Sequence, residues 1–424
     1  MGLINKLFKG DRSIWIIFMF LCLVSLVEVY SATSTLAYKN TYFWMPIFKH
    51  ARILLFGFGA VLLLHNIPSK YYVVAIILMP LSIGLLAVTP FIGVYINEAY
   101  RQISIMGITF QPSEIGKIAC IVFVAFMLSK EGIISSNKIF WITLISVGIT
   151  CALILPENFS TAFLLFVVCF LMMFVGRVSI KKMLLLSVVL IMSGCLIIVA
   201  FRSISDEYAK DHLPKRFITW KLRVDDFGRD KGENKFTIND DNFQVSHSKI
   251  AIARGGILGK LPGRSVQRDF LPQAYSDFIY AIIIEEMGLL GGFFVLMLYV
   301  ILMFRVAIIA RRCKKLFPKY LALGCGLLIV IQAFINMAVA VNLIPVTGQP
   351  LPLISRGGTS TMLTCFYFGI ILSVSRFGAG MGEGDDEEQE IEEATELEEE
   401  GETAMPNDEN DASGIDKDNG LTDF

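Results

Sequence analysis

Ten runs of apolar residues, each close to the length of one membrane crossing, occupy most of this 424-residue chain. The hydrocarbon core of a bilayer is about 30 Å thick, and an α-helix crosses it in roughly 20 residues. Because backbone groups in lipid must be satisfied internally, such long runs indicate helices. The sequence therefore predicts an all-α, polytopic integral membrane protein. The ten predicted helices are about 14–36, 44–66, 70–92, 113–129, 138–155, 160–176, 183–201, 277–304, 318–344 and 358–377.

Composition supports this class and divides the chain by charge. Hydrophobic residues make up 54% of the sequence and the mean hydropathy is +0.62, which excludes an ordinary soluble domain. Residues 381–424 hold 19 Asp/Glu and one Lys; removing them from totals of 38 acidic and 37 basic residues leaves 19 and 36. The membrane part is therefore basic and suited to anionic lipids or phosphates. We expect residues 378–424 to be an acidic, disordered cytoplasmic tail.

Orientation follows from Lys and Arg in the short loops, which favour the cytoplasmic side. The basic short segments are 6–12, 177–182 and 305–319, and ten spans place all three on one side. Both termini are then predicted to be cytoplasmic. The loop at about 202–276, between the seventh and eighth helices, is then extracytoplasmic, and residues 1–377 form one transmembrane domain.

Several kinds of chemistry have no signal in this sequence. The eight cysteines lie in or beside apolar runs, where they are expected to pack rather than to form disulfides or zinc sites. The four histidines are scattered, and no nucleotide-binding glycine motif is present. The sequence therefore favours neither a cysteine or histidine metal site nor a nucleotide-dependent or nucleic-acid-binding protein.

Asp277 is the most informative single residue. It lies where the long loop re-enters the membrane, in the run from Phe270 to Tyr280. A carboxylate at a water–lipid boundary is costly and usually functional, which makes Asp277 a candidate catalytic residue. An aspartate that caps the start of the eighth helix is the alternative, and the residues alone do not decide between the two.

Other charged residues share the predicted outer side. Glu114 and Lys117 open the fourth helix three residues apart and so lie on one face, either as part of a site or as an ion pair that only holds packing. Arg101 precedes them and is a candidate phosphate ligand. Glu285 and Glu286 lie about 12 Å further along the eighth helix than Asp277. At least one should face the interior and pair with a cation or hydroxyl, and we favour a structural or coupling role over a catalytic one.

Two loop segments complete the candidate site. In the long loop we select Arg216, Gln244 and Ser248, although loop side chains are often merely solvated. Residues 345–360 are rich in Pro and Gly and cannot form a plain helix, so we expect a shaped loop near Asp277. Its backbone N–H groups and the start of the tenth helix are suited to phosphate, and a tight turn that only ends helices is the alternative. The candidates in this block are Ser355, Arg356, Gly357, Gly358 and Ser360.

Four sequence blocks, taken together, resemble a known family. They are Phe110–Glu114 with Lys117; Phe243-Gln244 with Ser248 and on to Gly255-Gly256; Leu271-Pro272 through Asp277 to Gly288; and Leu343–Gly348 through Leu351–Ser360. Over residues 12–377 the chain resembles the SEDS family, the polytopic peptidoglycan polymerases that include FtsW and RodA. The block Pro345–Ser360 and the acidic tail favour the FtsW branch.

The resemblance implies a function. Asp277 matches the family's catalytic aspartate, and the expected activity is an inverting glycosyltransferase that polymerises lipid II on the outer face of the cytoplasmic membrane during division. One carboxylate can serve as the base that such inversion requires. The implied partners are lipid II and the growing glycan strand, a class B penicillin-binding protein and other division-complex membrane proteins. The need for a divalent cation, Mg²⁺ or Mn²⁺, is left open.

The chain also departs from the family pattern. Arg356 stands where the family usually has an aromatic residue, Arg101-Gln102 replaces Arg-Trp, and Pro156-Glu157-Asn158 replaces Gln-Pro-Asp. Asn158 argues against an essential carboxylate at that position. Alternative functions are a RodA-like elongation polymerase, a lipid II flippase that uses intramembrane glutamates, and a non-enzymatic division scaffold.

Overall fold

The computed structural model describes the chain with gaps. The described residues are 8–32, 45–96, 99–105, 108–204, 217–223, 238, 242–271 and 276–378. The chain divides into two units, Met1–Ala379 and Gly380–Phe424, and everything described below belongs to the first. The predicted acidic tail, from residue 379 onward, lies outside the described residues.

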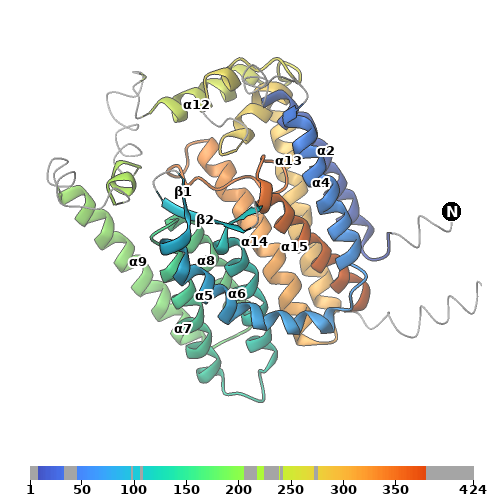
Figure 1. Cartoon of the computed structure of the whole chain (residues 1–424), viewed down its shortest axis with the longest axis vertical. Coiled ribbons are helices and arrows are strands. Elements are labelled where there is room, and N and C mark those ends of the chain that lie inside the picture. The colour runs from blue at the N-terminus through green and yellow to red at the C-terminus, as the bar shows by residue number, and fades with distance from the viewer. Residues whose placement is uncertain are drawn as a thin grey trace, which may run out of the picture. The chain divides into compact units, whose positions relative to one another are not determined.

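All ten predicted helices are present (Figure 1). They are α2 (Arg12–Ala32), α4 (Met45–Leu64), the 3-10 helix η1 (Ser69–Ile77) continuing as α5 (Leu78–Ile92), α6 (Pro112–Ser129), α7 (Ser136–Ile154), α8 (Phe159–Val175), α9 (Ile180–Ser203), α13 (Ile279–Arg312), α14 (Leu316–Ala340) and α15 (Gly358–Phe377). In the described part of the chain, nine helices are long and apolar enough to span a membrane, and α8 is a shorter apolar helix. The protein is a multi-pass membrane protein.

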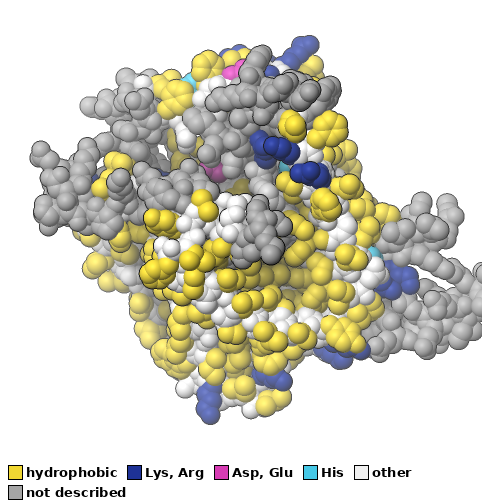
Figure 2. Space-filling view, in the orientation of Figure 1, with side chains coloured by type: hydrophobic (Ala, Val, Ile, Leu, Met, Phe, Trp, Pro, Cys, Tyr) yellow, Lys and Arg dark blue, Asp and Glu magenta, His cyan; other side chains and the backbone are white. Residues whose placement is uncertain are grey.

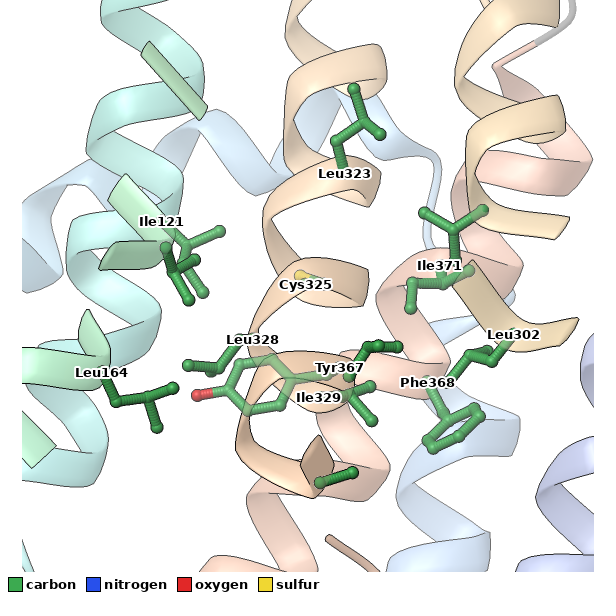
Figure 3. Close-up of a cluster of buried hydrophobic side chains, with 14 of the residues drawn as sticks. Ile121, Leu164, Leu302, Leu323, Cys325, Leu328, Ile329, Tyr367, Phe368 and Ile371 are labelled. Carbon is green, nitrogen blue, oxygen red and sulfur yellow. The ribbon is translucent and has the colours of Figure 1, made fainter. Parts of the chain in front are cut away.

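Helix α14 lies at the centre of the bundle, where it packs against α6, α8, α13 and α15. Figure 3 shows the side chains that meet there, including Ile121, Leu164, Leu328 and Phe368. Elsewhere a glycine lets two helices, α4 and α15, pack closely: a Cβ on Gly57 would lie 2.5 Å from the sulfur of Cys365. Because lipid is as apolar as the core, such close packing replaces the hydrophobic effect as the main stabiliser. Outside the core, a broad belt of hydrophobic side chains covers the helical body, with Lys and Arg mostly above and below it (Figure 2).

A small antiparallel sheet joins α5 to α6, which the sequence did not predict. Its strands are β1 (Val94–Ile96), β2 (Ala99–Ile105) and β3 (Ile108–Phe110), in the order β1-β2-β3. Val94 pairs with Gln102, and Ile103 pairs with Phe110. Two of these strands have only three residues, too few to show an alternating pattern. The sheet brings β2 into contact with α6.

The long loop contains α12 (Phe243–Gly255) and the short 3-10 helix η2 (Gln267–Asp269). The hydroxyl of Ser248 donates a hydrogen bond to the backbone oxygen of Ala340, the last residue of α14, over 2.7 Å. A Cβ on Gly255 would lie 2.0 Å from the backbone oxygen of Ile284, so only glycine permits the contact there between α12 and α13. The second half of the loop is therefore packed on the bundle.

Helix α13 is broken at Gly288, whose φ of 73° and ψ of −178° are not helical. The loop that follows α12 enters the break. Backbone N–H groups of Lys260 and Leu261 donate to the oxygens of Glu285 and Glu286, and those of Leu289 and Leu290 donate to Gly256 and Ile257, at 2.8–3.3 Å. The backbone groups released by the break thus find partners, as buried backbone groups must. The sequence predicted an unbroken helix here.

Candidate functional site

Asp277 lies two residues before the start of α13. Its Oδ1 accepts a hydrogen bond from the hydroxyl of Ser276 over 3.0 Å. The N-cap position of α13 is Phe278, and no side chain caps this helix end. The capping role that the sequence left open is therefore not the one that Asp277 plays in the structure.

The backbone around Asp277 is held by side chains from other segments. The hydroxyl of Ser355 donates to the oxygen of Ser276 over 2.7 Å. The side-chain amide of Asn336, in α14, donates to the oxygen of Asp277 over 3.0 Å and to that of Gln349 over 2.8 Å. Ser355 and Asn336 are both buried. The position of Asp277 is thus set jointly by α14 and by the loop before α15.

The electrostatic surroundings of Asp277 suit a base. Burial raises the pKa of this carboxyl above its usual value, while the Ser276 hydrogen bond and the charge of Arg223 pull the pKa down. Arg223 also donates to the backbone oxygen of Val346 over 3.1 Å. A carboxylate with a raised pKa, when ionised, accepts a proton more readily than an ordinary one.

The loop between α14 and α15 lies beside Asp277, as the sequence predicted. A Cβ on Gly348 would be 3.9 Å from Asp277 Oδ2, and the φ of +69° at Gly348 favours glycine. The loop is fixed from three sides: Gln349 donates to the hydroxyl of Thr161 in α8, Gln332 of α14 donates to Pro350, and Tyr299 of α13 donates to Pro352. These hydrogen bonds hold the loop in place, so it is more than a tight turn that ends two helices.

The predicted residues of this block occupy different surroundings. Ser355 is buried and bonded to backbone, as described above, whereas Arg356 is half-buried and within electrostatic range of His50 in α4. Gly357 is the N-cap of α15, and Gly358 and Ser360 lie in its first turn, with Gly358 exposed. The first turn of a helix presents N–H groups that suit an anion.

Glu114 and Lys117 form the predicted pair on one face of α6. Their side chains are 2.7 Å apart and only 10% and 2% exposed. Nearby, Tyr367 of α15 lies within electrostatic range of Glu114. The hydroxyls of Ser113 and Tyr367 are buried without a hydrogen-bond partner among the described residues. Among the residues that the structure describes, no hydrogen bond or ion pair joins Glu114 or Lys117 to Asp277.

Arg101 lies beside the hairpin between α7 and α8. Its Nε donates to the backbone oxygen of Glu157 over 3.2 Å. Burial raises the pKa of Glu157 from 4.5 to about 7. The side chain of Asn158 accepts from the backbone N–H of Thr161 over 3.2 Å and so caps α8. The departure from the family at Asn158 therefore serves a local structural role.

The remaining loop candidates are placed as follows. Gln244 lies half-buried in the first turn of α12, and Ser248 is the buried contact to Ala340 described above. Arg216 lies outside the described residues. Arg223 is the basic residue that acts on Asp277, and nothing in the charge pattern singled it out among the 14 Lys and Arg of this loop.

Glu285 and Glu286 are buried and hold the segment 263–268 in place. Glu286 accepts hydrogen bonds from the hydroxyl of Ser31 in α2 and from the backbone of Gly263 and Ser265. Glu285 accepts from the hydroxyl of Ser265 and the backbone of Gln267. This confirms the prediction that at least one of the two pairs with a cation or hydroxyl.

Helix α2 joins the same polar cluster. Arg268 lies 3.9 Å from Glu286 and donates to the backbone oxygen of Ser31 over 3.2 Å. Glu28, one turn before Ser31, is fully buried, and neither of its oxygens has a hydrogen-bond partner among the described residues. The cluster joins α2, α13 and the long loop.

Comparison with known proteins identifies the family. Residues 11–379 match the FtsW/RodA/SpoVE family model, described as "Cell cycle protein". The chain is 29% identical over 381 residues to a probable peptidoglycan glycosyltransferase FtsW of Geobacter sulfurreducens, covering 88% of this chain and 96% of that protein. It is 31% identical over 375 residues to the Haemophilus influenzae protein of the same name, covering 86% and 90%.

Solved structures show the same fold. A peptidoglycan synthase complex that coordinates polymerization and crosslinking contains a chain that aligns with a TM-score of 0.67 at 22% identity, over 87% of this chain and 98% of that one. Thermus thermophilus RodA aligns with a TM-score of 0.60 at 19% identity, over 87% and 97%. The chain belongs to the FtsW/RodA/SpoVE family of membrane proteins.

Proposed function

We propose that this protein is a peptidoglycan glycosyltransferase that polymerises lipid II into glycan strands on the outer face of the cytoplasmic membrane during cell division. One observation carries the proposal: the backbone at Asp277 is held by two other segments, and its buried carboxyl has a raised pKa that the charge of Arg223 moderates. The relatives named FtsW support this activity and the septal role.

The chemistry requires one base. Lipid II carries a sugar joined through an α-linkage to a polyprenyl pyrophosphate, and a β-linked product requires inversion at the anomeric carbon. The attacking sugar hydroxyl forms a bond to that carbon while the carbon–oxygen bond to pyrophosphate breaks. Asp277 would take the proton of the attacking hydroxyl in the same step.

The leaving pyrophosphate requires positive charge and N–H donors. Arg223 acts on Asp277 and donates to Val346 in the loop before α15, and Arg356 with the first turn of α15 lies at the other end of that loop. Guanidinium groups bind phosphate through paired hydrogen bonds, which suits both arginines. Lys117, Arg101 and Arg216 remain candidates for the same role.

A divalent cation, Mg²⁺ or Mn²⁺, would be bound mainly by the substrate's pyrophosphate. In the described ranges no group of three or more His, Cys, Asp and Glu is arranged to hold a metal ion. Mg²⁺ commonly binds substrate phosphates with only one or two carboxylates, and Asp277 is the carboxylate placed to contribute.

The proposal includes a location and partners. Both termini would be cytoplasmic, as the basic short loops suggest, and the protein would act at the division septum. A class B penicillin-binding protein would cross-link the new strand, alongside other division-complex proteins. The alignment with a chain of a peptidoglycan synthase complex supports this partnership.

The test is a polymerisation assay with purified protein, its cognate penicillin-binding partner, lipid II and divalent cation, with products resolved on a gel. Wild type is expected to make polymer, and Asp277→Asn, which keeps the shape but loses the base, none. Asp269→Asn changes an acid of the same loop whose side chain is 53% exposed, and should behave as wild type.

The other outcomes distinguish the alternatives. Polymer from Asp277→Asn would keep the enzyme and assign the base elsewhere. Absence of polymer from a folded wild type with an active partner would favour the lipid II flippase, to be tested by translocation in vesicles. A scaffold predicts that cells carrying only the Asp277→Asn protein still divide.

A further inference from the structure

The segment between α12 and η2 carries an exposed apolar tip. Ile257, Leu258 and Leu261 are 66%, 78% and 59% exposed. They lie beside Leu289 and Leu290 of α13, because the backbone of residues 256–257 is hydrogen-bonded to these two leucines. Leu289 and Leu290 are themselves 51% and 57% exposed, so the apolar surface is continuous from the loop to the helix. An apolar patch of this kind marks a contact with a partner or with a membrane.

The height of the tip can be estimated from α13. After the break at Gly288 the helix runs to Arg311 and Arg312, which mark the far end of its apolar stretch. A 30 Å hydrocarbon layer corresponds to roughly 20 helical residues, and counting back from Arg311 reaches about Gly291. The tip is paired with the two residues just before that point, so it lies at the lipid boundary.

The exposed charged side chains from Arg254 to Arg264 are all basic, whereas Glu285 of α13, which lies 3.8 Å from Arg254, is buried. From Phe243 to Arg268 the chain has no Asp or Glu and five basic residues. Three of them, Arg254, Lys260 and Arg264, are exposed next to the tip. Apolar side chains bordered by Lys and Arg are typical of segments that insert between lipid headgroups and contact anionic lipid phosphates.

The tip is also fixed in shape. Its backbone is paired with both sides of the break in α13, and a Cβ on Gly259 would lie 2.2 Å from the oxygen of Glu286. Insertion of such a segment requires little further ordering of the chain.

We propose that residues 254–264 are a lipid-anchoring tip that inserts Ile257, Leu258 and Leu261 into the outer leaflet and binds anionic phospholipid phosphates through Arg254, Lys260 and Arg264. This anchor does not depend on the proposed polymerase activity. It fixes the long loop to the leaflet in which a lipid-linked substrate would reside.

Photo-crosslinking tests the apolar part. The photoreactive residue p-benzoylphenylalanine is placed at Leu258 in the full-length protein, in nanodiscs of equal phosphatidylglycerol and phosphatidylcholine. Phe270 is the matched control position: it is 52% exposed in the same loop but stacks on His247, about two turns of α12 from the tip. Mass spectrometry should find at least about 5-fold more lipid adduct at position 258. Equal yields at both positions would overturn the proposal.

Charge variants test the phosphate contacts. With the probe at Leu258, adducts should be enriched in phosphatidylglycerol, and Lys260→Gln with Arg264→Gln should lower that enrichment by about 5-fold or more, since each basic residue near a surface contributes about 1 kcal/mol. If the enrichment is unchanged, Lys260 and Arg264 do not bind the lipid phosphates, and this part of the proposal is wrong. In cells, capture of a protein instead of lipid by the Leu258 probe would show that this surface docks a partner and would also overturn the proposal.

Discussion

The side-chain amide of Asn336 donates one hydrogen bond to the backbone oxygen of Asp277 and a second to that of Gln349. Asn336 is 1% exposed and lies in a largely apolar helix, where a buried polar side chain is costly unless it has a task. The Asn336 side chain thus links the backbone of Asp277 to the loop before α15, in which Gly348 lies close to the Asp277 carboxylate. A displacement of the base by about 1 Å can lower a rate about 100-fold, so this junction should control turnover.

We expect Asn336→Ala to lower kcat for lipid II polymerisation by about 10- to 100-fold, with KM changed by less than about 3-fold, because it misplaces the base without removing a substrate contact. Gln332→Ala is the matched control: its buried amide donates to Pro350 and does not contact Asp277. Both variants lose a buried hydrogen bond, so equal loss of kcat in both would show that the effect is only structural.

Arg223→Gln should move the acid limb of the pH–rate profile to higher pH. The charge of Arg223 lowers the pKa of Asp277, so its removal raises that pKa further, and a base works only above its own pKa. Initial rates measured from pH 5 to 9 check this. The control is Lys138→Gln, which changes an exposed lysine in α7 and should not shift the profile. If Arg223→Gln also leaves the profile unchanged, Arg223 does not affect the pKa of the base.

Lys117→Met should destabilise the protein by about 3–5 kcal/mol, because it leaves Glu114 buried without its partner. The double variant Glu114→Gln with Lys117→Met should recover most of that stability in thermal unfolding. If the pair binds substrate, the stable double variant remains inactive in the lipid II assay. If the double variant is active, Glu114 and Lys117 serve only packing and do not bind substrate.

Glu157→Gln should remove a pH dependence of stability. Burial raises the pKa of Glu157 from 4.5 to about 7, so the unfolded chain loses this proton before the folded one does. The contribution is fully present below about pH 4.5 and is lost as pH rises to 7. The Tm of wild type should therefore fall relative to that of Glu157→Gln between pH 5 and 8. Parallel Tm curves would contradict the raised pKa.

The sequence predicts the helices well, because a span of roughly 20 apolar residues has one stable structure in lipid. It also locates Asp277, since a carboxylate at a loop–helix boundary stands out against apolar neighbours. The break at Gly288 was not predictable, because glycine is common in membrane helices and only the docked loop reveals its φ of 73°. Asn336 and Arg223 were missed because their partners, Asp277 and Val346, lie 59 and 123 residues away.

The break in α13 has a consequence for how this loop can vary. Surface loops usually tolerate insertions and deletions, because their ends are free to adjust. Here each of four loop residues makes one specific backbone hydrogen bond to one side or the other of the break in α13: Gly256, Ile257, Lys260 and Leu261. One added or deleted residue would leave buried backbone groups without partners. The length of this connection should therefore be as invariant among relatives as that of a helical turn.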